Sequence, residues 1–189
     1  MTETLPDRFC WTHRPDHGPD ERLLRLRPGN TVLDLGCGRG TQLAYLSRTH
    51  HTHGIGIDHE AEWRAGVCTY AHGGTAEFLH ATALDYLTQQ AGSSIDAIYS
   101  RFGAIWFTDP DQLLPLITTR LQPGGRLVFS HLAPGYPSFD IPRWDHTPGH
   151  WQDRLADLGF TELRTQLLPC HGKCSYPACT GVMIVEGTR

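Results

Sequence analysis

Val32-Leu-Asp-Leu-Gly-Cys-Gly-Arg-Gly40 is the stretch of this sequence that decides its fold. A short apolar run surrounds Asp34, glycines follow at 36, 38 and 40, and a helical pattern begins at once. Glycine suits such a turn because it lets the backbone approach a ligand closely and adopt conformations that side chains disfavour. The stretch therefore predicts a strand, a ligand-binding turn and a helix in direct succession.

The spacing of these glycines differs from the dinucleotide fingerprint G-x-G-x-x-G, in which a pyrophosphate lies at the helix N-terminus. Here the third glycine comes one residue early, and Asp34 lies two residues before the first. S-adenosylmethionine has no pyrophosphate and carries a cationic amino acid group, so it suits this turn better than NAD. A second acid, Asp58, ends the run Gly54-Ile-Gly-Ile-Asp58, where it can accept both hydroxyls of a ribose.

Apolar runs alternate with amphipathic stretches along the chain, a pattern typical of strands and crossover helices in a mostly parallel sheet. Asp109-Pro110 and Thr147-Pro148 mark two helix starts, because a polar side chain caps free amides and proline fits the first helical position. We expect strands near residues 31–35, 54–58, 75–79, 95–99, 125–131, 161–167 and 181–186. We expect helices at about 19–26, 40–49, 60–71, 83–90, 110–121 and 148–158.

The composition indicates one α/β domain over residues 1–189. Hydrophobic residues make up 39% and charged residues 19%, and the sequence shows neither a signal-peptide pattern nor a long apolar run. We therefore expect a cytoplasmic protein that does not contact membranes, with its six cysteines reduced. The net charge of -4 and the lack of a basic cluster argue against nucleic acid as a partner.

The chain resembles the class I S-adenosylmethionine-dependent methyltransferases from about Phe9 to Glu186. Besides the glycine turn, the resemblance rests on residues 95–100 as a fourth strand, 121–129 entering a fifth and 155–160 entering a sixth. Residues 102–110 and 11–19 resemble a subgroup common in actinobacterial small-molecule biosynthesis.

This resemblance implies an open, three-layer, mostly parallel sheet of seven strands in the order 3-2-1-4-5-7-6, with strand 7 antiparallel and the ligand at the carboxyl ends of strands 1 to 4. Residues 1–18 are expected to form an N-terminal lid segment, and residues 132–147 a loop that covers the substrate. The expected cofactor is S-adenosyl-L-methionine, bound by Asp34, Gly36, Cys37, Gly38, Gly40, Asp58, His59, Thr82, Ala83 and Ser100.

Two positions depart from the family pattern where ligand is expected. Thr82 stands where the family commonly has an acid for the adenine amine, and a hydroxyl accepts that bond more weakly. Asp85 is an alternative acceptor, although its position favours the first turn of the next helix. Arg101 follows the fourth strand, where the subgroup has an apolar residue; facing the site it would bind an anion, and facing outward it would be solvated.

Methyl transfer from a sulfonium depends mainly on positioning, and a base is needed only if the acceptor must lose a proton. His131, at the end of the fifth strand, is the candidate base because its ordinary pKa lies near 6.5. The catalytic candidates are therefore His131 and Arg101. The candidate substrate contacts are Trp11, Tyr99, Trp106, Tyr136 and His146, although such residues are often part of a core.

No metal is expected. Cys170, Cys174 and Cys179 lack the Cys-x2-Cys spacing of structural zinc sites, so a hairpin with reduced thiols is the simpler interpretation. The end of the fourth strand, Ser100-Arg101, also lacks the carboxylates that a hard cation requires.

Two function hypotheses follow. The first is methyl transfer to a small, anionic biosynthetic intermediate. The alternative is a methyltransferase-like enzyme of natural-product biosynthesis that catalyses an intramolecular displacement, cyclisation or elimination of an anionic leaving group. A homodimer or a partner protein is compatible with either, and a non-enzymatic role in stabilising another chain is a third option.

Overall fold

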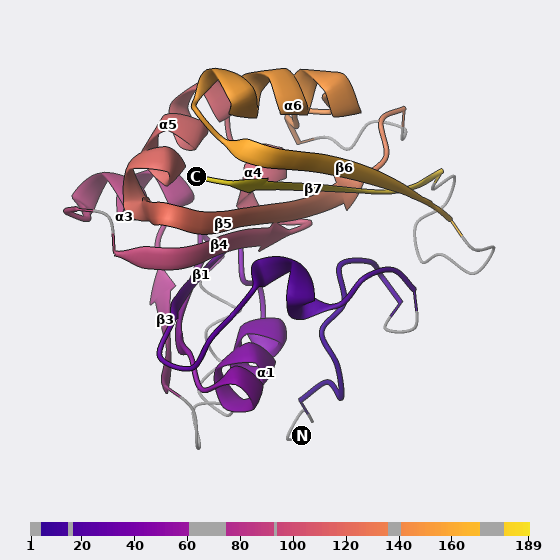
Figure 1. Cartoon of the computed structure of the whole chain (residues 1–189). Coiled ribbons are helices and arrows are strands. Elements are labelled where there is room, and N and C mark those ends of the chain that lie inside the picture. Colours follow the sequence, from indigo (N-terminus) through magenta and orange to yellow (C-terminus); the bar gives the residue numbers. More distant parts are fainter. Residues whose placement is uncertain (1–4, 15–16, 61–74, 93, 136–140, 171–179) are drawn as a thin grey trace.

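The computed structural model describes residues 5–14, 17–60, 75–92, 94–135, 141–170 and 180–189. Seven strands form one sheet in the order β3-β2-β1-β4-β5-β7-β6. Strand β7 runs antiparallel to both its neighbours, and the other pairs are parallel, as expected (Figure 1). The strands are β1 (Thr31–Leu35), β2 (His53–Asp58), β3 (Thr75–His80), β4 (Ile95–Arg101), β5 (Leu121–Leu132), β6 (Thr161–Pro169) and β7 (Gly181–Thr188).

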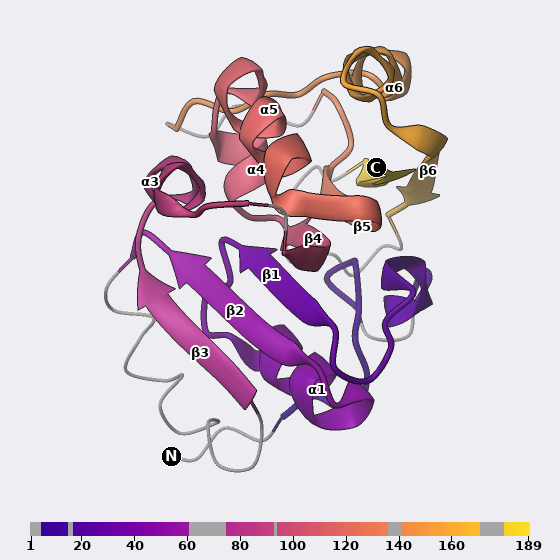
Figure 2. The same ribbon diagram turned by 60° about the vertical axis from the view of Figure 1, so that its left-hand side comes forward.

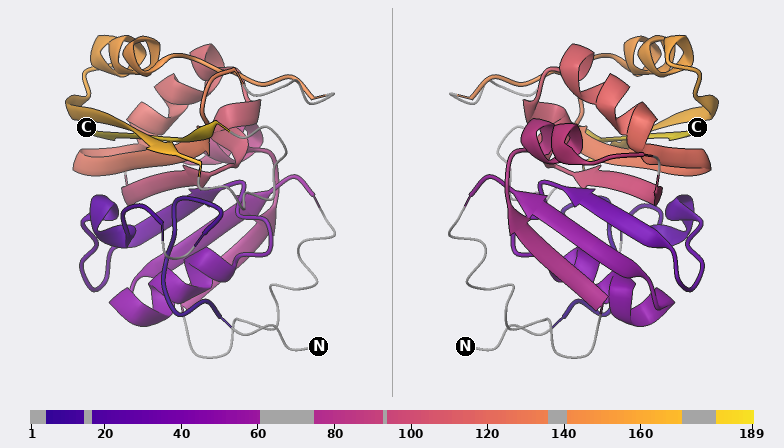
Figure 3. Two further views of the ribbon diagram at one scale, coloured as in Figure 1. Left: turned by 90° about the vertical axis from the view of Figure 1, so that its right-hand side faces the viewer. Right: turned by 90° about the vertical axis from the view of Figure 1, so that its left-hand side faces the viewer.

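Helices cover both faces of this sheet, which gives three layers (Figure 2). One face carries α1 and η1, and the other carries α3, α5 and α6, as the two views of Figure 3 show. The helices are η1 (Glu21–Leu24), α1 (Thr41–His50), α3 (Ala83–Gln89), α4 (Ala104–Phe107), α5 (Pro110–Arg120) and α6 (Pro148–Asp157). No helix of the described ranges has the length and apolar character needed to cross a bilayer.

The expected helix boundaries were partly right. Asp109 and Thr147 cap α5 and α6 by accepting hydrogen bonds from the amides of Asp111 and His150, which confirms both helix starts. The helix expected over 19–26 is wrong: only a short 3-10 turn forms, because Arg25 adopts a left-handed conformation and ends it. The helix expected over 60–71 falls almost entirely outside the described residues.

Two apolar cores separate on the two faces of the sheet because successive side chains of a strand point to opposite sides. In β1, Val32 belongs to the core under α1, whereas Leu33 and Leu35 belong to the core under α3 and α5. The same alternation in β4 sends Ile98 to one face and Tyr99 to the other.

The N-terminal segment is part of the core on the α1 face. Phe9 and Trp11 are fully buried, and the Trp11 indole donates a hydrogen bond to the Asp20 carbonyl at 2.9 Å. Ser130 of β5 donates to the Trp11 carbonyl at 2.8 Å. Phe9 and Trp11, which fall within the lid segment expected over residues 1–18, are therefore part of the buried core.

The carboxyl ends of β1, β2 and β4 meet at one edge of the sheet. Asp34 lies opposite Gly56 of β2 and Tyr99 of β4 in the strand register. Each strand is followed there by a turn, and the turn after β1 packs on the turn after β4. Gly36 and Gly103 allow this approach, since a Cβ on Gly36 would lie 2.8 Å from the Gly103 Cα.

Candidate functional site

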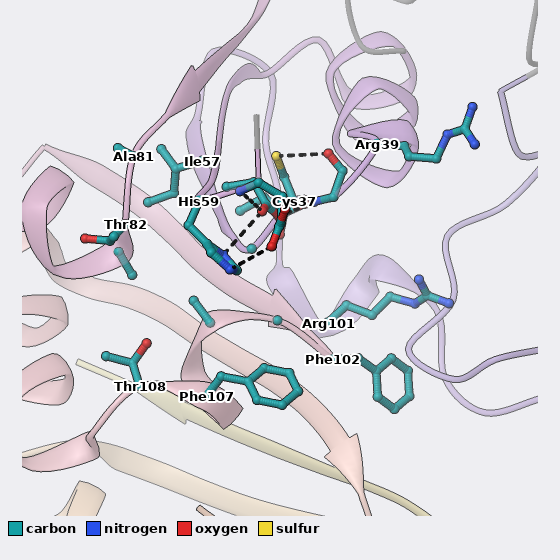
Figure 4. Close-up of a pocket in the computed structure, with 18 of the residues that line it drawn as sticks. Cys37, Arg39, Ile57, His59, Ala81, Thr82, Arg101, Phe102, Phe107 and Thr108 are labelled. Carbon is teal, nitrogen blue, oxygen red and sulfur yellow. Dashed lines mark hydrogen bonds and ion pairs between the residues drawn. The ribbon is translucent and has the colours of Figure 1, made fainter. Parts of the chain in front are cut away.

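A pocket of about 720 Å³ opens at this edge of the sheet, within the range of small-ligand sites. It is formed by the turns after β1, β2 and β4, the start of α3, and the chain around residue 141 (Figure 4). Its lining includes the predicted residues Asp34, Gly36, Cys37, Gly38, Asp58, His59, Thr82, Ala83 and Arg101.

The glycines of the turn have different roles. Gly36 has a φ of 82°, and a Cβ there would lie 2.6 Å from the Ala104 amide nitrogen, so its requirement is close packing of backbone. Gly38 has a φ of 52° and open space beside it, which leaves its backbone accessible from the pocket. Gly40 does not line the pocket: a Cβ there would collide with the Phe78 ring at 2.3 Å. The structure therefore explains Gly40 by packing against Phe78 of β3 and gives no support to the expected ligand contact.

Asp58 is held at the end of β2 by backbone amides. One carboxylate oxygen accepts from Gly38 N at 2.8 Å and the other from Glu60 N at 2.9 Å. The side chain is 14% exposed and lines the pocket, so a ligand there can reach the carboxylate. The adjacent His59 side chain is 70% exposed, with Nδ1 3.6 Å from Asp58 Oδ1.

Asp34 is the most buried acid of the pocket wall, at 3% exposure. Its Oδ1 is buried and has no hydrogen bond of normal geometry among the described residues; the buried Tyr99 hydroxyl, likewise without one, is close enough to lower the pKa of this carboxyl. Burial raises the pKa of the Asp34 carboxyl to about 7; the Tyr99 hydroxyl and the Arg101 guanidinium oppose that rise, and the Asp58 carboxylate adds to it. A buried acceptor without a donor is costly, so this atom is suited to a donor supplied by a ligand.

Arg101 lines the pocket, as expected if it faces the site. One terminal nitrogen donates to the Thr12 carbonyl at 2.7 Å, and the guanidinium carbon lies 5.5 Å from the centroid of the Phe102 ring. The Nε atom is buried and has no acceptor among the described residues. The guanidinium is thus fixed by backbone and ring while part of its hydrogen-bonding capacity is unused.

Thr82 and Asp85 form the cap of α3. The Thr82 hydroxyl donates to Asp85 Oδ2 at 2.7 Å and accepts from the Asp85 amide at 3.1 Å. This geometry places Asp85 in the first helical turn, as its position favoured, and Thr82 at the cap with its hydroxyl already used. Thr82 and Ala83 line the pocket, so they contribute a wall there.

Ser100 lies beneath the pocket and does not line it. Ser100 is 1% exposed. Its hydroxyl donates to the Leu35 carbonyl at 2.7 Å and accepts from the Ile105 amide at 3.3 Å. These bonds join the ends of β1 and β4 to the start of α4. The expected cofactor contact of Ser100 is therefore not supported, because its hydroxyl is enclosed by backbone partners.

His131 is a second site candidate that lies outside the pocket. It is fully buried on β5; Nδ1 is 2.7 Å from the Leu132 carbonyl, and the Trp151 indole donates to Nε2 at 3.0 Å. Burial lowers the pKa of His131 to about 4, so the ring is neutral near pH 7. Because both nitrogens are engaged within the core, this arrangement does not support His131 as a general base.

The expected aromatic substrate contacts mostly belong to the core. Trp11 and Tyr99 pack edge to face with a 6.0 Å centroid separation, and both are fully buried. Trp106 donates to Asp145 Oδ1 at 2.8 Å and stacks on His131, which anchors residues 143–145 on α4. His146 packs against Trp151 with ring centroids 4.8 Å apart. None of these four lines the pocket, and Tyr136 lies outside the described residues.

Several lining residues were missed by sequence reasoning. Arg39 lies in the turn between β1 and α1, Phe102 directly after β4, and Phe107 and Thr108 at the end of α4. Arg39 and Phe102 could have been found from their position in the turns after β1 and β4, whereas Phe107 and Thr108 carried no such signal because they end a short helix. Ile141, within the loop expected to cover the substrate, also lines the pocket and is 61% exposed.

Within the described ranges, no cluster of three or more His, Cys, Asp or Glu side chains is arranged to hold a metal ion. Cys170 follows β6, whereas Cys174 and Cys179 fall outside those ranges. The strands that flank them, β6 and β7, pair antiparallel.

The fold and the site together define a Rossmann-like α/β protein with its ligand pocket at the switch between β1 and β4. A family model described as a methyltransferase domain matches residues 33–129, more than half of the 189 residues. The chain belongs to this methyltransferase domain family, and its sheet order is that of class I S-adenosylmethionine-dependent methyltransferases.

Curated relatives match this chain at low identity and over part of their length. Phosphoethanolamine N-methyltransferase 1 of Zea mays is 31% identical over 156 residues, which cover 74% of this chain and 30% of the relative. Trans-aconitate 2-methyltransferase of Azoarcus sp. (strain BH72) is 32% identical over 129 residues, covering 67% of this chain and 48% of the relative. The chain thus spans about 30% of the length of the plant relatives it matches.

Solved structures share the fold. Phosphoethanolamine N-methyltransferase 2 of Haemonchus contortus, in complex with S-adenosyl-L-methionine, aligns with a TM-score of 0.75 at 14% identity. The alignment covers 89% of this chain and 50% of that one. This likeness confirms the predicted architecture.

Proposed function

We propose that this chain transfers a methyl group from S-adenosyl-L-methionine to a small, anionic biosynthetic intermediate. The observation that carries the proposal is the convergence of Asp34 and Asp58 at a glycine-lined pocket, with Asp34 Oδ1 buried and lacking a donor. Membership of the methyltransferase domain family supports it. When bound, the cofactor would supply an electrophilic methyl group on a sulfonium.

The residues of the pocket fit that cofactor. Asp58 has lone pairs for the ribose hydroxyls, and Asp34 has an unused oxygen for an ammonium group. Gly38 presents open backbone between them. Two acids in a partly buried wall also favour a cationic ligand electrostatically.

The described residues would act mainly by positioning. A displacement at a methyl group requires the attacking atom in line with the bond that breaks, and holding both partners accounts for much of the rate. Phe107, Thr108 and Ile141 also line the pocket, and the proposal places the acceptor beside them. Both ring nitrogens of His131 are bonded within the core, so the proposed reaction assigns no general base to this residue.

The anionic class of the acceptor is supported by cations and by relatives. The lining contains Arg39 and Arg101, and guanidinium groups bind carboxylate or phosphate well. The relatives named above act, by their names, on phosphoethanolamine and trans-aconitate, both small molecules with anionic groups. Because the chain spans a fraction of those relatives, the acceptor remains this proposal's prediction.

The test is calorimetric binding of S-adenosylhomocysteine to the wild type, to Asp58→Asn and to the matched control Asp157→Asn. Asp157 is exposed at the end of α6 and outside the pocket. We expect Asp58→Asn to weaken binding by about 1–3 kcal/mol and Asp157→Asn to leave it unchanged. Absence of wild-type binding at millimolar ligand would refute the proposal.

A product assay separates methyl transfer from the non-methylating alternative. The wild type is incubated with S-adenosyl-L-methionine and a panel of phosphate- and carboxylate-bearing small molecules. The products are identified by mass spectrometry. A methylated acceptor together with S-adenosylhomocysteine supports the proposal. Acceptor conversion with the cofactor intact would favour displacement or elimination instead.

A further inference from the structure

The lining of the pocket divides into an acidic side and an apolar side. The acids that line it, Asp34, Asp58 and Glu60, come from β1, the end of β2 and the residues directly after β2. The described turn after β4 and the short helix α4 contribute Phe102 and Phe107 to the lining, and no acid. Figure 4 shows both rings on one side of the pocket. A cationic cofactor suits the acidic side, so an acceptor with a negative charge is directed to the apolar side.

Phe102 is held in an unusual backbone conformation. Its φ is 51°, in the left-handed region that bulky side chains rarely adopt, and such outliers gather at functional sites. The amide of Phe102 donates to the Ser130 carbonyl at 2.8 Å, and its ring stacks on the His13 ring with centroids 4.0 Å apart. These two contacts hold the Phe102 ring where it lines the pocket.

Phe107 and Ile141 extend the apolar side of the pocket. Phe107 packs on Trp106 of α4, with ring centroids 4.9 Å apart. The Trp144 amide donates to the Trp106 carbonyl at 3.0 Å, which fastens the chain just after Ile141 to α4. Ile141 lines the pocket and is 61% exposed, so it has apolar surface that a ligand could cover. Walls of apolar and aromatic side chains with a few polar groups are typical of small-ligand pockets.

Arg101 supplies a positive charge next to these apolar side chains. Its guanidinium carbon lies 5.5 Å from the centroid of the Phe102 ring, and one terminal nitrogen donates to the Thr12 carbonyl at 2.7 Å. Within the described part of the chain, Arg101 makes no ion pair within 4.0 Å. A ligand that used the cation and the rings together would therefore carry its charge directly beside an apolar body.

We propose that the methyl acceptor is an amphiphilic anion: its carboxylate or phosphate binds Arg101, and its aromatic or aliphatic body packs on Phe102, Phe107 and Ile141. This inference rests on the proposed function, because it takes S-adenosyl-L-methionine as the methyl donor. It narrows the acceptor from any small anion to one in which an apolar body adjoins the charge. Packing of that body removes apolar surface of both partners from water, and the cation fixes the orientation of the acceptor.

The first test titrates small probes by calorimetry into the full-length wild type saturated with S-adenosylhomocysteine. Phenylacetate, hexanoate and phenyl phosphate each join an apolar body to an anion, whereas acetate lacks the body and phenylacetamide lacks the charge. We expect at least one of the three apolar anions to bind about 10-fold or more tightly than both acetate and phenylacetamide. If none of the three binds more tightly than these two probes, the inference is overturned.

Variants then locate the contacts of the apolar anion that binds best. Phe107→Ala should weaken it about 10-fold and Ile141→Ala about 3- to 10-fold, because each variant removes apolar contact. The matched control is Leu167→Ala, which should leave the affinity unchanged, since Leu167 is 55% exposed on β6 and does not line the pocket. Arg101→Gln should weaken the anion about 10-fold and leave phenylacetamide unchanged. All four variants should bind S-adenosylhomocysteine as the wild type does.

Phe107→Leu keeps apolar bulk and should restore most of the affinity, so it also serves if Phe107→Ala fails to fold. If Leu167→Ala weakens the anion as much as Ile141→Ala does, the effect is not local to the pocket and the inference fails. If Arg101→Gln weakens S-adenosylhomocysteine and leaves the anion unchanged, Arg101 serves the cofactor instead of the acceptor. Failure of the wild type to bind S-adenosylhomocysteine would instead refute the proposed function.

Discussion

Arg101 ends β4, whereas Arg126 lies within the neighbouring strand β5, opposite Ala97 and away from the pocket edge. Arg126 is 3% exposed and donates to the Glu186 carboxylate, to Thr188 Oγ1 at 2.7 Å and to the Leu23 carbonyl at 3.1 Å. Arg101 donates to a single carbonyl and has a buried Nε without a partner among the described residues. The difference separates a cation that holds the fold together from one that is available to a ligand.

The same distinction applies to the other buried polar groups. His131 and Ser100 have partners on every side and lie outside the pocket, whereas Asp34 lines it with an unused oxygen. Substitution of a satisfied group should therefore lower the free energy of unfolding and leave affinity unchanged. Substitution of an unsatisfied group should weaken affinity, and where that group is a buried charge it should also remove the cost of burying it. Four experiments test this rule, in order of decreasing effect.

Arg126→Met should be the most damaging change, because it leaves the Glu186 carboxylate buried without its partner. We expect a loss of about 3–5 kcal/mol in the free energy of unfolding. Denaturation with urea measures it, and Arg126→Met combined with Glu186→Leu should recover most of the loss. A loss below about 1 kcal/mol would show that the pair does not hold β5 to β7.

Asp34→Asn should stabilise the ligand-free protein above neutral pH. The pKa of Asp34 is raised to about 7 in the fold, so ionisation costs stability as pH rises from about 4 to 7. Asn removes that cost, and we expect a gain of about 2–4 kcal/mol at pH 8 that vanishes at pH 4. S-adenosylhomocysteine binding should be lost in the same variant.

Unfolding curves measured across this pH range check the sign. The lowered pKa of His131 gives wild type and variant alike a loss of stability on acidification from about pH 6.5 to 4. The difference between the two proteins therefore isolates Asp34. Parallel curves with a constant offset would contradict an elevated pKa at this carboxyl.

Trp151→Phe should cost about 1–3 kcal/mol of stability, since His131 Nε2 loses the indole donor that lies 3.0 Å away. The affinity for S-adenosylhomocysteine should not change, because neither residue lines the pocket. Thermal unfolding and calorimetry give the two readouts. A weakened affinity with normal stability would return His131 to the candidate site residues.

Thr82→Ala should have the smallest effect, a loss of about 1 kcal/mol from the cap of α3. Thr82→Ser keeps the hydroxyl that Asp85 contacts and should be close to wild type. Both are measured by urea denaturation. If Thr82→Ala weakened S-adenosylhomocysteine binding and left stability unchanged, the hydroxyl would be a ligand contact after all.

Local sequence patterns predicted most of the fold. The glycine spacing after β1, the acids Asp34 and Asp58 at strand ends, and the caps at Asp109 and Thr147 all depend on neighbours within a few residues. The resemblance to the methyltransferases supplied the strand order, which the structure confirms. The pocket edge and fewer than half of its lining residues followed from these features and the resemblance together.

Side-chain roles were less predictable, because they depend on contacts between distant segments. Ser100 and His131 stand at strand ends where ligand was expected, yet Leu35 and Trp151 occupy their hydrogen-bonding atoms. Trp11 belongs to a segment that was expected to form a lid, yet it is buried in the core on the α1 face of the sheet. Residue type and spacing do not indicate which distant residues will pack against these side chains or form hydrogen bonds with them.

By itself, the sequence determined where the strands end and that an acid and three glycines stand at one of those ends. That information is local, because backbone conformation and side-chain alternation are set by adjacent residues. The tertiary structure alone decided which polar groups are satisfied: Arg126 meets Glu186, while Arg101 and Asp34 meet no full set of partners in the described chain. Hydrogen-bond satisfaction depends on residues far apart in the sequence, so only the folded chain distinguishes a structural arginine from one that can bind a ligand.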